Sequence, residues 1–428
     1  MQLNHKKKSL KMQKRIVKSL SKGLFVFLLF LFASCEEKIL DGSISETVLN
    51  EGEWKMNMKL KSKVLPFGFR FEYEAGEPFI KIVNGKETIV VNNILRKEDS
   101  IIVKMPVFES TFYLKVHDES FLEGEWVNYY KGADYRIPVK AHYGRTNRFD
   151  KSSKSPIVGK YEVTFGEGLE DEFKAIGLFK ADKGIQLGTF ATETGDYRHL
   201  EGVRTEDSLF LSTFDGSHAF LFEAKIKGDT LDGVFLSGSH YKVNWSAFPN
   251  ETASLKNADS LTFLKKGYDN FSFQFPDQNG DTVSLSDARF ENKAVIVQIM
   301  GSWCPNCLDE TNYYKTLHDK YQKEGLEIVA LAFERTKTQE RAYANLNRLL
   351  EKTKANYPFL LAGATRETKA SEALPMLNHI MSYPTSIFLD RNHEIKRIHT
   401  GFYGPSTGEY YSHFVKSTEA LVEDMLKD

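Results

Sequence analysis

The fold of this chain can be worked out from one stretch, Ala294-Val295-Ile296-Val297-Gln298-Ile299-Met300-Gly301-Ser302-Trp303-Cys304-Pro305-Asn306-Cys307. Its first seven residues are almost all apolar and rich in β-branched side chains. This predicts a strand covered on both faces, as in a parallel sheet. Residues 308–324 then place apolar side chains on one face of a helix. The stretch therefore predicts a strand, a Gly-Ser turn, and a helix with Cys304 at its N-terminus.

The position of Cys304 has chemical consequences. The first turn of a helix carries unpaired N–H groups and the positive end of the helix dipole, and both favour a thiolate over a thiol. Cysteines in this setting have pKa values of about 3.5–7.5, compared with about 8.5 for a free cysteine. We therefore expect Cys304 to be the nucleophile. Cys307 should be more buried and able to attack a mixed disulfide on Cys304. Pro305 suits the first helical position, where its missing N–H is not needed.

Trp-Cys-x-x-Cys after an apolar strand resembles the active site of thioredoxins. From Phe271 to about Leu426 the pattern is similar to the extracytoplasmic TlpA/ResA-like thiol-disulfide oxidoreductases, thioredoxin-like proteins with an AhpC/TSA-Redoxin type domain. This resemblance implies an α/β thioredoxin-like domain at 271–428, with Trp303 and Pro305 bordering the substrate groove. It also implies a disulfide reductase without a cofactor, which acts on protein disulfides and is recharged by a membrane electron donor.

A second landmark is Tyr383-Pro384-Thr385, which precedes the apolar run 386–389. In thioredoxin-like folds a cis-proline faces the active site at this point. The resemblance therefore implies that Pro384 is cis and lies beside Cys304, and that the backbone of Tyr383 can pair with a substrate strand. Taken alone, the same residues would indicate an ordinary turn proline.

Glu310 is the candidate for proton handling. In ResA-like proteins a glutamate three residues after the second cysteine lies near the active site, and Glu310 occupies that position. The alternative role is helix solvation or a favourable charge in the first turns. Thioredoxin has a buried aspartate six residues before the first cysteine, whereas this chain has Gln298, which cannot titrate. The departure assigns more of the proton transfer to Glu310.

The remaining elements of the redox domain follow in order. An Asn-Gly hairpin is expected within 271–285, and later segments alternate between apolar runs and helical patterns. Strands are expected at 327–333, 357–362, 385–390 and 394–400, and helices at 339–354, 367–377 and 412–426. Pro375 should kink or end the second of these helices.

The N-terminus resembles a lipoprotein leader. Eight basic residues and no acidic residue occupy 1–22, then comes the apolar run 24–32, then Ala33-Ser34-Cys35. By this resemblance, residues 1–34 are removed, Cys35 is lipidated and 35–50 is a tether. Plain secretion is the alternative. The protein is then lipid-anchored outside the cytoplasm, on the periplasmic face of a membrane or, as the acidic 36–37 weakly suggest, on the cell surface of a Gram-negative bacterium.

The net charge and the number of cysteines exclude several classes of function. Without the leader, 49 basic and 58 acidic residues remain, a net charge of −9, which argues against a nucleic-acid partner. Only three cysteines occur, and an exported domain with one CxxC uses it for redox or metal chemistry. A zinc site needs four ligands and only two thiols are present, so no metal is expected. Leu308 stands where c-type haem attachment needs His, and Trp303 and Pro305 do not fit a peroxiredoxin.

Residues 51–250 read as a duplicated β region. Runs of alternating polarity are separated by turn residues, which predicts antiparallel strands in a barrel or sandwich. Segments recur at a nearly constant offset, such as 96–102 with 204–210 and 122–126 with 231–235. We expect one copy at 51–150, a second at 157–250 and a linker at 251–270.

No catalytic pattern occurs in the β region, so it is assigned no chemistry. The polar and aromatic segment 189–198 is interpreted as a Gly-containing hairpin rather than a binding site, because turns require this composition. Trp54, Trp126 and Trp245 are expected in the core. The alternative function is a surface lipoprotein whose β region binds a ligand or partner, with the redox domain as an accessory.

Overall fold

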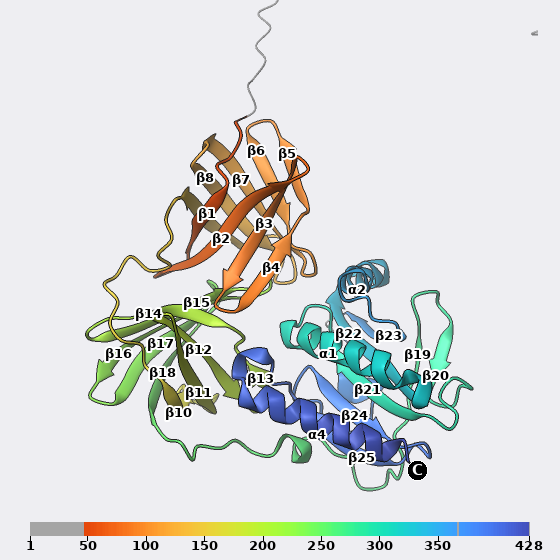
Figure 1. Cartoon of the computed structure of the whole chain (residues 1–428). Helices are drawn as coiled ribbons and strands as arrows, with labels where there is room; N and C mark the ends of the chain where they lie inside the picture. Colours follow the sequence, from red (N-terminus) through yellow and green to blue (C-terminus); the bar gives the residue numbers. More distant parts are fainter. Residues whose placement is uncertain (1–46, 366–367, 428) are drawn as a thin grey trace, which may run out of the picture. The chain divides into compact units, whose positions relative to one another are not determined.

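A computed structural model describes residues 47–365 and 368–427 (Figure 1). The predicted leader at 1–34, the predicted lipidation site Cys35 and most of the 35–50 tether lie outside the described residues. In the described part of the chain, no helix combines the length and apolarity that a bilayer-spanning segment requires.

The first copy of the β region forms one nine-stranded antiparallel sheet. Its strands run in the order β4-β3-β2-β1-β9-β8-β7-β6-β5, so β1 pairs with β9 and the two end strands are consecutive in the chain. The strands are β1 (Gly52–Lys59), β2 (Val64–Glu74), β3 (Glu77–Asn84), β4 (Glu87–Val91), β5 (Ile94–Lys97), β6 (Ser100–Lys104), β7 (Ser110–Asp118), β8 (Phe121–Asn128) and β9 (Arg136–Tyr143).

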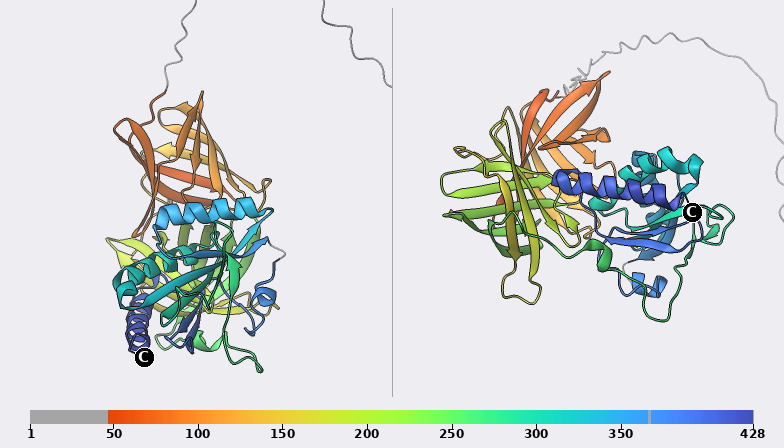
Figure 2. Two further views of the ribbon diagram at one scale, coloured as in Figure 1. Left: turned by 90° about the vertical axis from the view of Figure 1, so that its right-hand side faces the viewer. Right: turned by 60° about the horizontal axis from the view of Figure 1, so that its bottom comes forward.

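The second copy forms a sheet that closes on itself as a barrel (Figure 2). Its order is β11-β10-β18-β17-β16-β15-β14-β12-β13, and β11 also pairs with β12. The strands are β10 (Gly159–Phe165), β11 (Phe173–Asp182), β12 (Ile185–Thr192), β13 (Gly195–Asp196), β14 (Leu200–Arg204), β15 (Ser208–Phe214), β16 (Ala219–Lys227), β17 (Thr230–Ser237) and β18 (Tyr241–Pro249).

The duplication expected from the sequence is visible in the strand plan. β3 corresponds to β12, and β6, β7 and β8 of the first copy correspond to β15, β16 and β17. Gly124 and Gly233 occupy the same place in β8 and β17. A Cβ added there would lie 1.9 Å from the Tyr113 carbonyl oxygen and 2.4 Å from that of Glu223. Both copies therefore require glycine at this place, where the backbone of the neighbouring strand leaves no room for a side chain.

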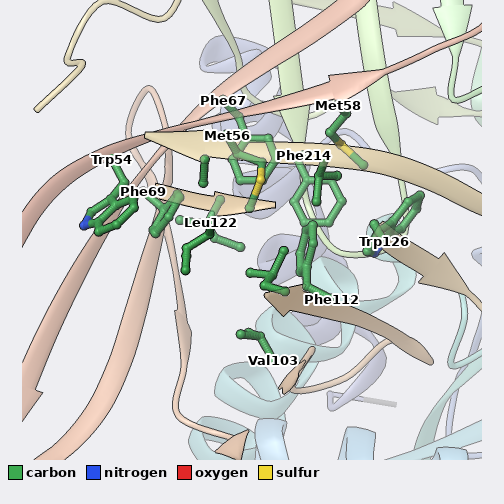
Figure 3. Packing of buried hydrophobic residues seen from close by; sticks show 14 of the residues in the cluster. Trp54, Met56, Met58, Phe67, Phe69, Val103, Phe112, Leu122, Trp126 and Phe214 are labelled. Atoms are coloured by element: carbon green, nitrogen blue, oxygen red, sulfur yellow. The ribbon is translucent and has the colours of Figure 1, made fainter. Parts of the chain in front are cut away.

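The two copies share a hydrophobic core. Phe214, at the end of β15, packs among the apolar side chains of the first copy (Figure 3). Its ring stacks on Phe67 with centroids 4.7 Å apart and meets Trp126 at 5.2 Å. Trp54, Trp126 and Trp245 are all buried, as predicted.

The redox domain is built on the five-stranded sheet β23-β22-β21-β24-β25. β21 pairs in parallel with β22 and antiparallel with β24, the arrangement of a thioredoxin-like fold. Every residue of β21 is buried, which explains its unbroken apolar sequence. The elements are β19 (Gln274–Pro276), β20 (Thr282–Ser284), β21 (Ala294–Met300), α1 (Pro305–Tyr321), β22 (Leu326–Thr336), α2 (Gln339–Thr353), β23 (Phe359–Thr365), α3 (Ala370–Ala373), β24 (Thr385–Leu389), β25 (Ile395–Thr400) and α4 (Glu409–Met425), with short 3-10 turns at Ala258–Ser260, Gln322–Glu324 and Pro405–Thr407.

Two sequence expectations differ from these bounds. The helix expected at 367–377 is only Ala370–Ala373 among the described residues, because the chain leaves helical geometry at Leu374, immediately before Pro375. The closing helix begins at Glu409 rather than 412, after Gly408. Within the expected linker, residues 263–265 are hydrogen-bonded to residues 376–378 of the redox domain, so this part of the linker belongs to the domain's surface.

Candidate active site

The two cysteines lie where β21 ends and α1 begins. Cys304 is the N-cap residue, with extended backbone angles, and the backbone N–H of Cys307 donates to its Sγ at 3.2 Å. The two residues are joined as a disulfide with Cα atoms 5.2 Å apart. Cys307 is fully buried and Cys304 is 6% exposed. The dithiol thus occupies a helix N-terminus, with its first sulfur nearer the surface, as the sequence predicted.

The loop that contains Tyr383 and Pro384 lies against the same disulfide. The Tyr383–Pro384 peptide bond is cis, which confirms the implication of the family resemblance. The carbonyl oxygen of Tyr383 lies 3.3 Å from Sγ of Cys304. The Tyr383 ring also meets the Trp303 ring edge-on, with centroids 5.4 Å apart. The residues predicted from two distant motifs therefore lie together around the Cys304–Cys307 disulfide.

Glu310 is buried beneath the first turns of α1. Its carboxylate accepts hydrogen bonds from Nε2 of Gln298 at 2.8 Å and from Oγ of Ser386 at 3.0 Å. Burial raises its pKa to about 8, although both hydrogen bonds oppose the shift. Since the side chain is inaccessible to solvent, the alternative role in helix solvation is wrong. Gln298, which replaces an acid of thioredoxin, serves here as a donor to Glu310.

Sequence reasoning missed Glu334. It lies in β22 and is 1% exposed, and its two carboxylate oxygens accept from the backbone N–H and the Oγ of Ser302, both at 2.7 Å. Burial raises the pKa of Glu334. These bonds fix the turn that leads into Cys304. An acid directly after the apolar run 328–333 was the available signal.

Trp303, predicted to border the substrate groove, packs against an aromatic ring and a guanidinium group. Tyr130, from the loop between β8 and β9 of the first copy, stacks on its ring at 5.3 Å, and the Arg335 guanidinium lies 3.8 Å from the ring centroid. The indole N–H donates to the carbonyl of Phe333 at 2.9 Å. Oγ of Ser217, in the second copy, donates to the Trp303 carbonyl at 3.2 Å.

Arg198 connects the second copy to the helix that carries the cysteines. The side chain is 7% exposed, and its Nη1 donates to the carbonyl of Pro305 at 2.9 Å and to the carboxylate of Asp309 at 2.5 Å. It also pairs with Glu87 of the first copy and approaches Asp215 at 3.7 Å. Although burial opposes it, these carboxylates raise the pKa of Arg198, so the guanidinium stays charged. Burial raises the pKa of Asp309 to about 7, against the Arg198 charge.

The segment 189–198 is the hairpin that the sequence indicated, and its tip also contacts the redox centre. That second property was not predicted, because its Thr, Glu, Gly and Asp residues suit a solvent-facing turn equally well. Among the described residues, no three His, Cys, Asp or Glu side chains are grouped as metal ligands are.

The fold and the site define a thioredoxin-like domain with a redox-active dithiol, that is, a thiol-disulfide oxidoreductase. Residues 265–410 match the Redoxin family. The thiol-disulfide oxidoreductase ResA of Geobacillus kaustophilus is 29% identical over 168 residues, which cover 39% of this chain and 82% of that protein. ResA of Bacillus subtilis is 23% identical over 156 residues, 36% of this chain and 79% of that protein.

Solved structures are similar to about a third of the chain. A thiol-disulfide oxidoreductase from Bacteroides fragilis is 16% identical with a TM-score of 0.27, and the match covers 34% of this chain and 99% of that chain. A thiol:disulfide interchange protein of the thioredoxin family from Chlorobium tepidum is 20% identical with a TM-score of 0.28, over 38% of this chain and 98% of that chain.

Proposed function

We propose that this protein is an extracytoplasmic, lipid-anchored reductase of protein disulfides. The observation that carries the proposal is a disulfide-forming cysteine pair at a helix N-terminus, with Cys304 as the N-cap residue and the cis-proline loop 3.3 Å from its sulfur. The names of the ResA relatives support the reaction type.

The reaction transfers two electrons from the dithiol to the substrate. The Cys304 thiolate, favoured by the N–H groups of the first helical turn, attacks one sulfur of a substrate disulfide. That S–S bond breaks, a Cys304–substrate disulfide forms and one substrate sulfur leaves as a thiolate. Cys307 loses its proton and attacks Sγ of Cys304, which forms the Cys304–Cys307 disulfide and releases the second substrate thiolate. A membrane dithiol donor must then reduce the pair again.

Glu310 serves the proton transfers of the buried cysteine. A carboxyl whose pKa is about 8 exchanges protons near neutral pH, unlike an exposed glutamate. Glu310 lies three residues after Cys307, on the same face of α1. Nε2 of Gln298 joins the two, since it donates to the carboxylate of Glu310 and, at 3.4 Å, to the carbonyl of Cys307.

The anchor is proposed from the leader sequence alone. A basic start, a short apolar run and Ala33-Ser34-Cys35 are typical of lipoproteins. Metabolic labelling with palmitate should mark the wild-type protein in the membrane fraction of a Gram-negative host, and Cys35→Ser should lose the label. Labelling of Cys35→Ser would contradict the lipidated cysteine.

The redox assignment is tested with three variants and dithiothreitol as the electron donor. Cys304→Ser should reduce insulin no faster than dithiothreitol alone, and Cys307→Ser should accumulate a mixed disulfide seen by mass spectrometry. Cys35→Ser, purified without lipid, is the control and should keep full activity. A reduction potential of about −270 mV or below would support a reductase, and one near about −120 mV would indicate an oxidant.

The alternative, a ligand-binding β region with an accessory redox domain, gives no reason for both copies to contact the residues on either side of Cys304. Tyr130 of the first copy stacks on Trp303, and Arg198 of the second copy donates to the carbonyl of Pro305. These contacts favour a role of the β region in the redox reaction itself.

A further inference from the structure

The tip of the β12–β13 hairpin lies against all three loops that frame Cys304. On the cysteine turn, Nδ2 of Asn306 donates to the Asp196 carbonyl at 3.2 Å. On the proline loop, Oγ of Ser382 donates to the Thr194 carbonyl at 2.7 Å. On the loop after β25, the N–H of Gly404 donates to the carboxylate of Asp196.

The contact between the hairpin and the redox domain involves the backbones themselves. A Cβ on Gly401 would lie 2.9 Å from the Thr194 carbonyl carbon, and one on Gly195 would lie 2.4 Å from Nδ2 of Asn306. Both glycines have positive φ, 82° and 134°. In addition, the Tyr403 hydroxyl donates to the Thr192 carbonyl at 3.0 Å. These close approaches and hydrogen bonds hold the tip of the hairpin beside the loop that contains the cis-proline.

The hairpin is anchored by charge as well. Arg198 has φ 57°, in the left-handed region that non-glycine residues rarely adopt. This backbone conformation accompanies a guanidinium that reaches Pro305 and Asp309 on the cysteine helix. Strained positions persist where surrounding contacts hold them, and they gather at functional sites.

We propose that residues 193–198 occupy the strand-binding position of the substrate groove and determine which disulfides the dithiol reduces. An extended polypeptide must displace the hairpin to pair with the Tyr383 backbone and reach Cys304, whereas a small disulfide needs much less of the groove. The apparent affinity for a polypeptide is then reduced by the fraction of molecules in which the hairpin is away. This inference rests on the proposed reductase activity and specifies its substrate selection.

Two variants loosen the hairpin without touching the cysteines. Asp309→Asn removes one ion pair of Arg198, and Tyr403→Phe removes a single hydroxyl bond to Thr192. Asp319→Asn is the matched control, because it lies on the same helix and pairs only within the redox domain, with Lys315 and Asn356. Each protein is assayed as the full chain with insulin and with glutathione disulfide.

Loss of one charged or neutral hydrogen bond shifts a closed–open equilibrium by about a factor of ten or about a factor of three, respectively. We therefore expect insulin reduction to rise about tenfold in Asp309→Asn and about threefold in Tyr403→Phe, with much smaller changes for glutathione disulfide and none in Asp319→Asn. Equal changes for the two substrates, or none, would overturn the inference. A wild-type protein that reduces neither substrate would overturn the proposed function as well.

Hydrogen exchange supplies an independent readout. In Cys307→Ser carrying a peptide as a mixed disulfide on Cys304, the amides of 193–198 should lose protection relative to the peptide-free protein. Amides in β16, which lies in the same barrel but away from these contacts, should exchange as before. Unchanged protection of 193–198 with a peptide bound would overturn the inference even if the redox reaction is confirmed.

Discussion

The two copies of the β unit differ most at one place, the segment after their third strand. In the first copy, β4 pairs with β3 along its whole length. In the second copy the equivalent segment pairs with β12 only at Gly195 and Asp196, and β14 then lies beside β12. The second copy therefore closes as a barrel, and it releases a short piece of chain from its sheet.

This segment is the one that contacts the helix carrying the cysteines. At the offset of the repeat, Arg198 is the counterpart of Val90, which stays in β4 and is 39% exposed. Arg198 instead donates to Pro305 on the cysteine helix. Glu87, at the start of the first copy's β4, completes the cluster. The second copy thus contacts the cysteine helix at the place where it has less backbone pairing than the first copy. The strand order around the shared core is otherwise the same in both copies.

Arg198→Met tests this difference between the copies and should have the largest effect on stability. It leaves the buried carboxylates of Asp309 and Asp215 without their cation, which costs about 3–5 kcal/mol of unfolding free energy. Val90→Met, at the equivalent place in the first copy, should change stability by less than about 0.5 kcal/mol. Urea unfolding of both variants measures the difference. Similar losses in the two variants would contradict the assigned role of Arg198.

Glu310→Gln tests whether the redox domain titrates independently of the two copies. Glu310 ionises above about pH 4.5 in the unfolded chain but only near pH 8 when folded. The unfolded state then binds fewer protons between these values, so the free energy of unfolding falls as pH rises through this window. Glu310→Gln should remove the Glu310 contribution to this slope, worth on the order of a few kcal/mol, and leave the contribution of Asp309, whose pKa burial raises to about 7.

The pH dependence of the unfolding free energy, measured in Arg198→Met, distinguishes the contribution of Glu310 from that of Asp309, its neighbour on α1. The carboxylate of Glu310 accepts hydrogen bonds from Gln298 and Ser386, both within the redox domain, so its contribution to the slope should persist. Asp309 is held by Arg198, so its contribution should change. A slope in Glu310→Gln as steep as that of the wild-type protein would contradict the raised pKa of Glu310.

Gly124→Ala and Gly233→Ala test a place where the two copies have the same structure. In each, the new methyl group meets a backbone carbonyl of the neighbouring strand. Overpacking of this kind costs about 1–3 kcal/mol. Both variants should lose stability to a similar degree in thermal unfolding. Gly228→Ala, where nothing lies within 4 Å, is a control for steric contact, although its φ of 62° adds some strain of its own.

Tyr130→Ala has the smallest expected effect. Removal of the ring stacked on Trp303 should cost about 0.5–1.5 kcal/mol beyond the lost burial. The counterpart of Tyr130 in the second copy, at the offset of the repeat, is Gly238, so only the first copy supplies this contact. Collisional quenching of tryptophan fluorescence should increase in Tyr130→Ala and remain unchanged in Tyr113→Ala. Unchanged quenching in Tyr130→Ala would contradict the covering of Trp303.

Much of the redox domain was predictable because its signals are local. The run 294–300 forms a fully buried strand, and Cys304 caps the helix that follows, as the residue order indicated. The length of the helix near 370 was wrong, since the pattern continued through Pro375 while the chain did not. The nearly constant offset of the repeat also predicted the duplication, because strands that pair in the same order keep the same spacing.

The neighbours of the dithiol were much less predictable. Glu334 had a weak signal as one acid after an apolar run, whereas Tyr130, Ser217 and Arg198 had none. These three residues lie far from the cysteine turn in the sequence, in loops whose composition fits solvent exposure. Sequence periodicity reports which face of an element is buried, and it carries no information about which distant loop covers a turn.

The amino-acid sequence by itself determined the dithiol, its place at a helix start, the proline loop and the repeated β unit. The helix start and the repeated unit follow from short-range rules of polarity, backbone geometry and spacing, whereas the place of the proline loop was implied by the family resemblance. Only the tertiary structure decided that Glu310 is buried with a raised pKa, that Trp303 packs against Tyr130 and Arg335, and that the hairpin 193–198 contacts the loops near Cys304. The physical reason is that burial and charge at this site come from chain segments far apart in the sequence, which the packing of three sheets brings together.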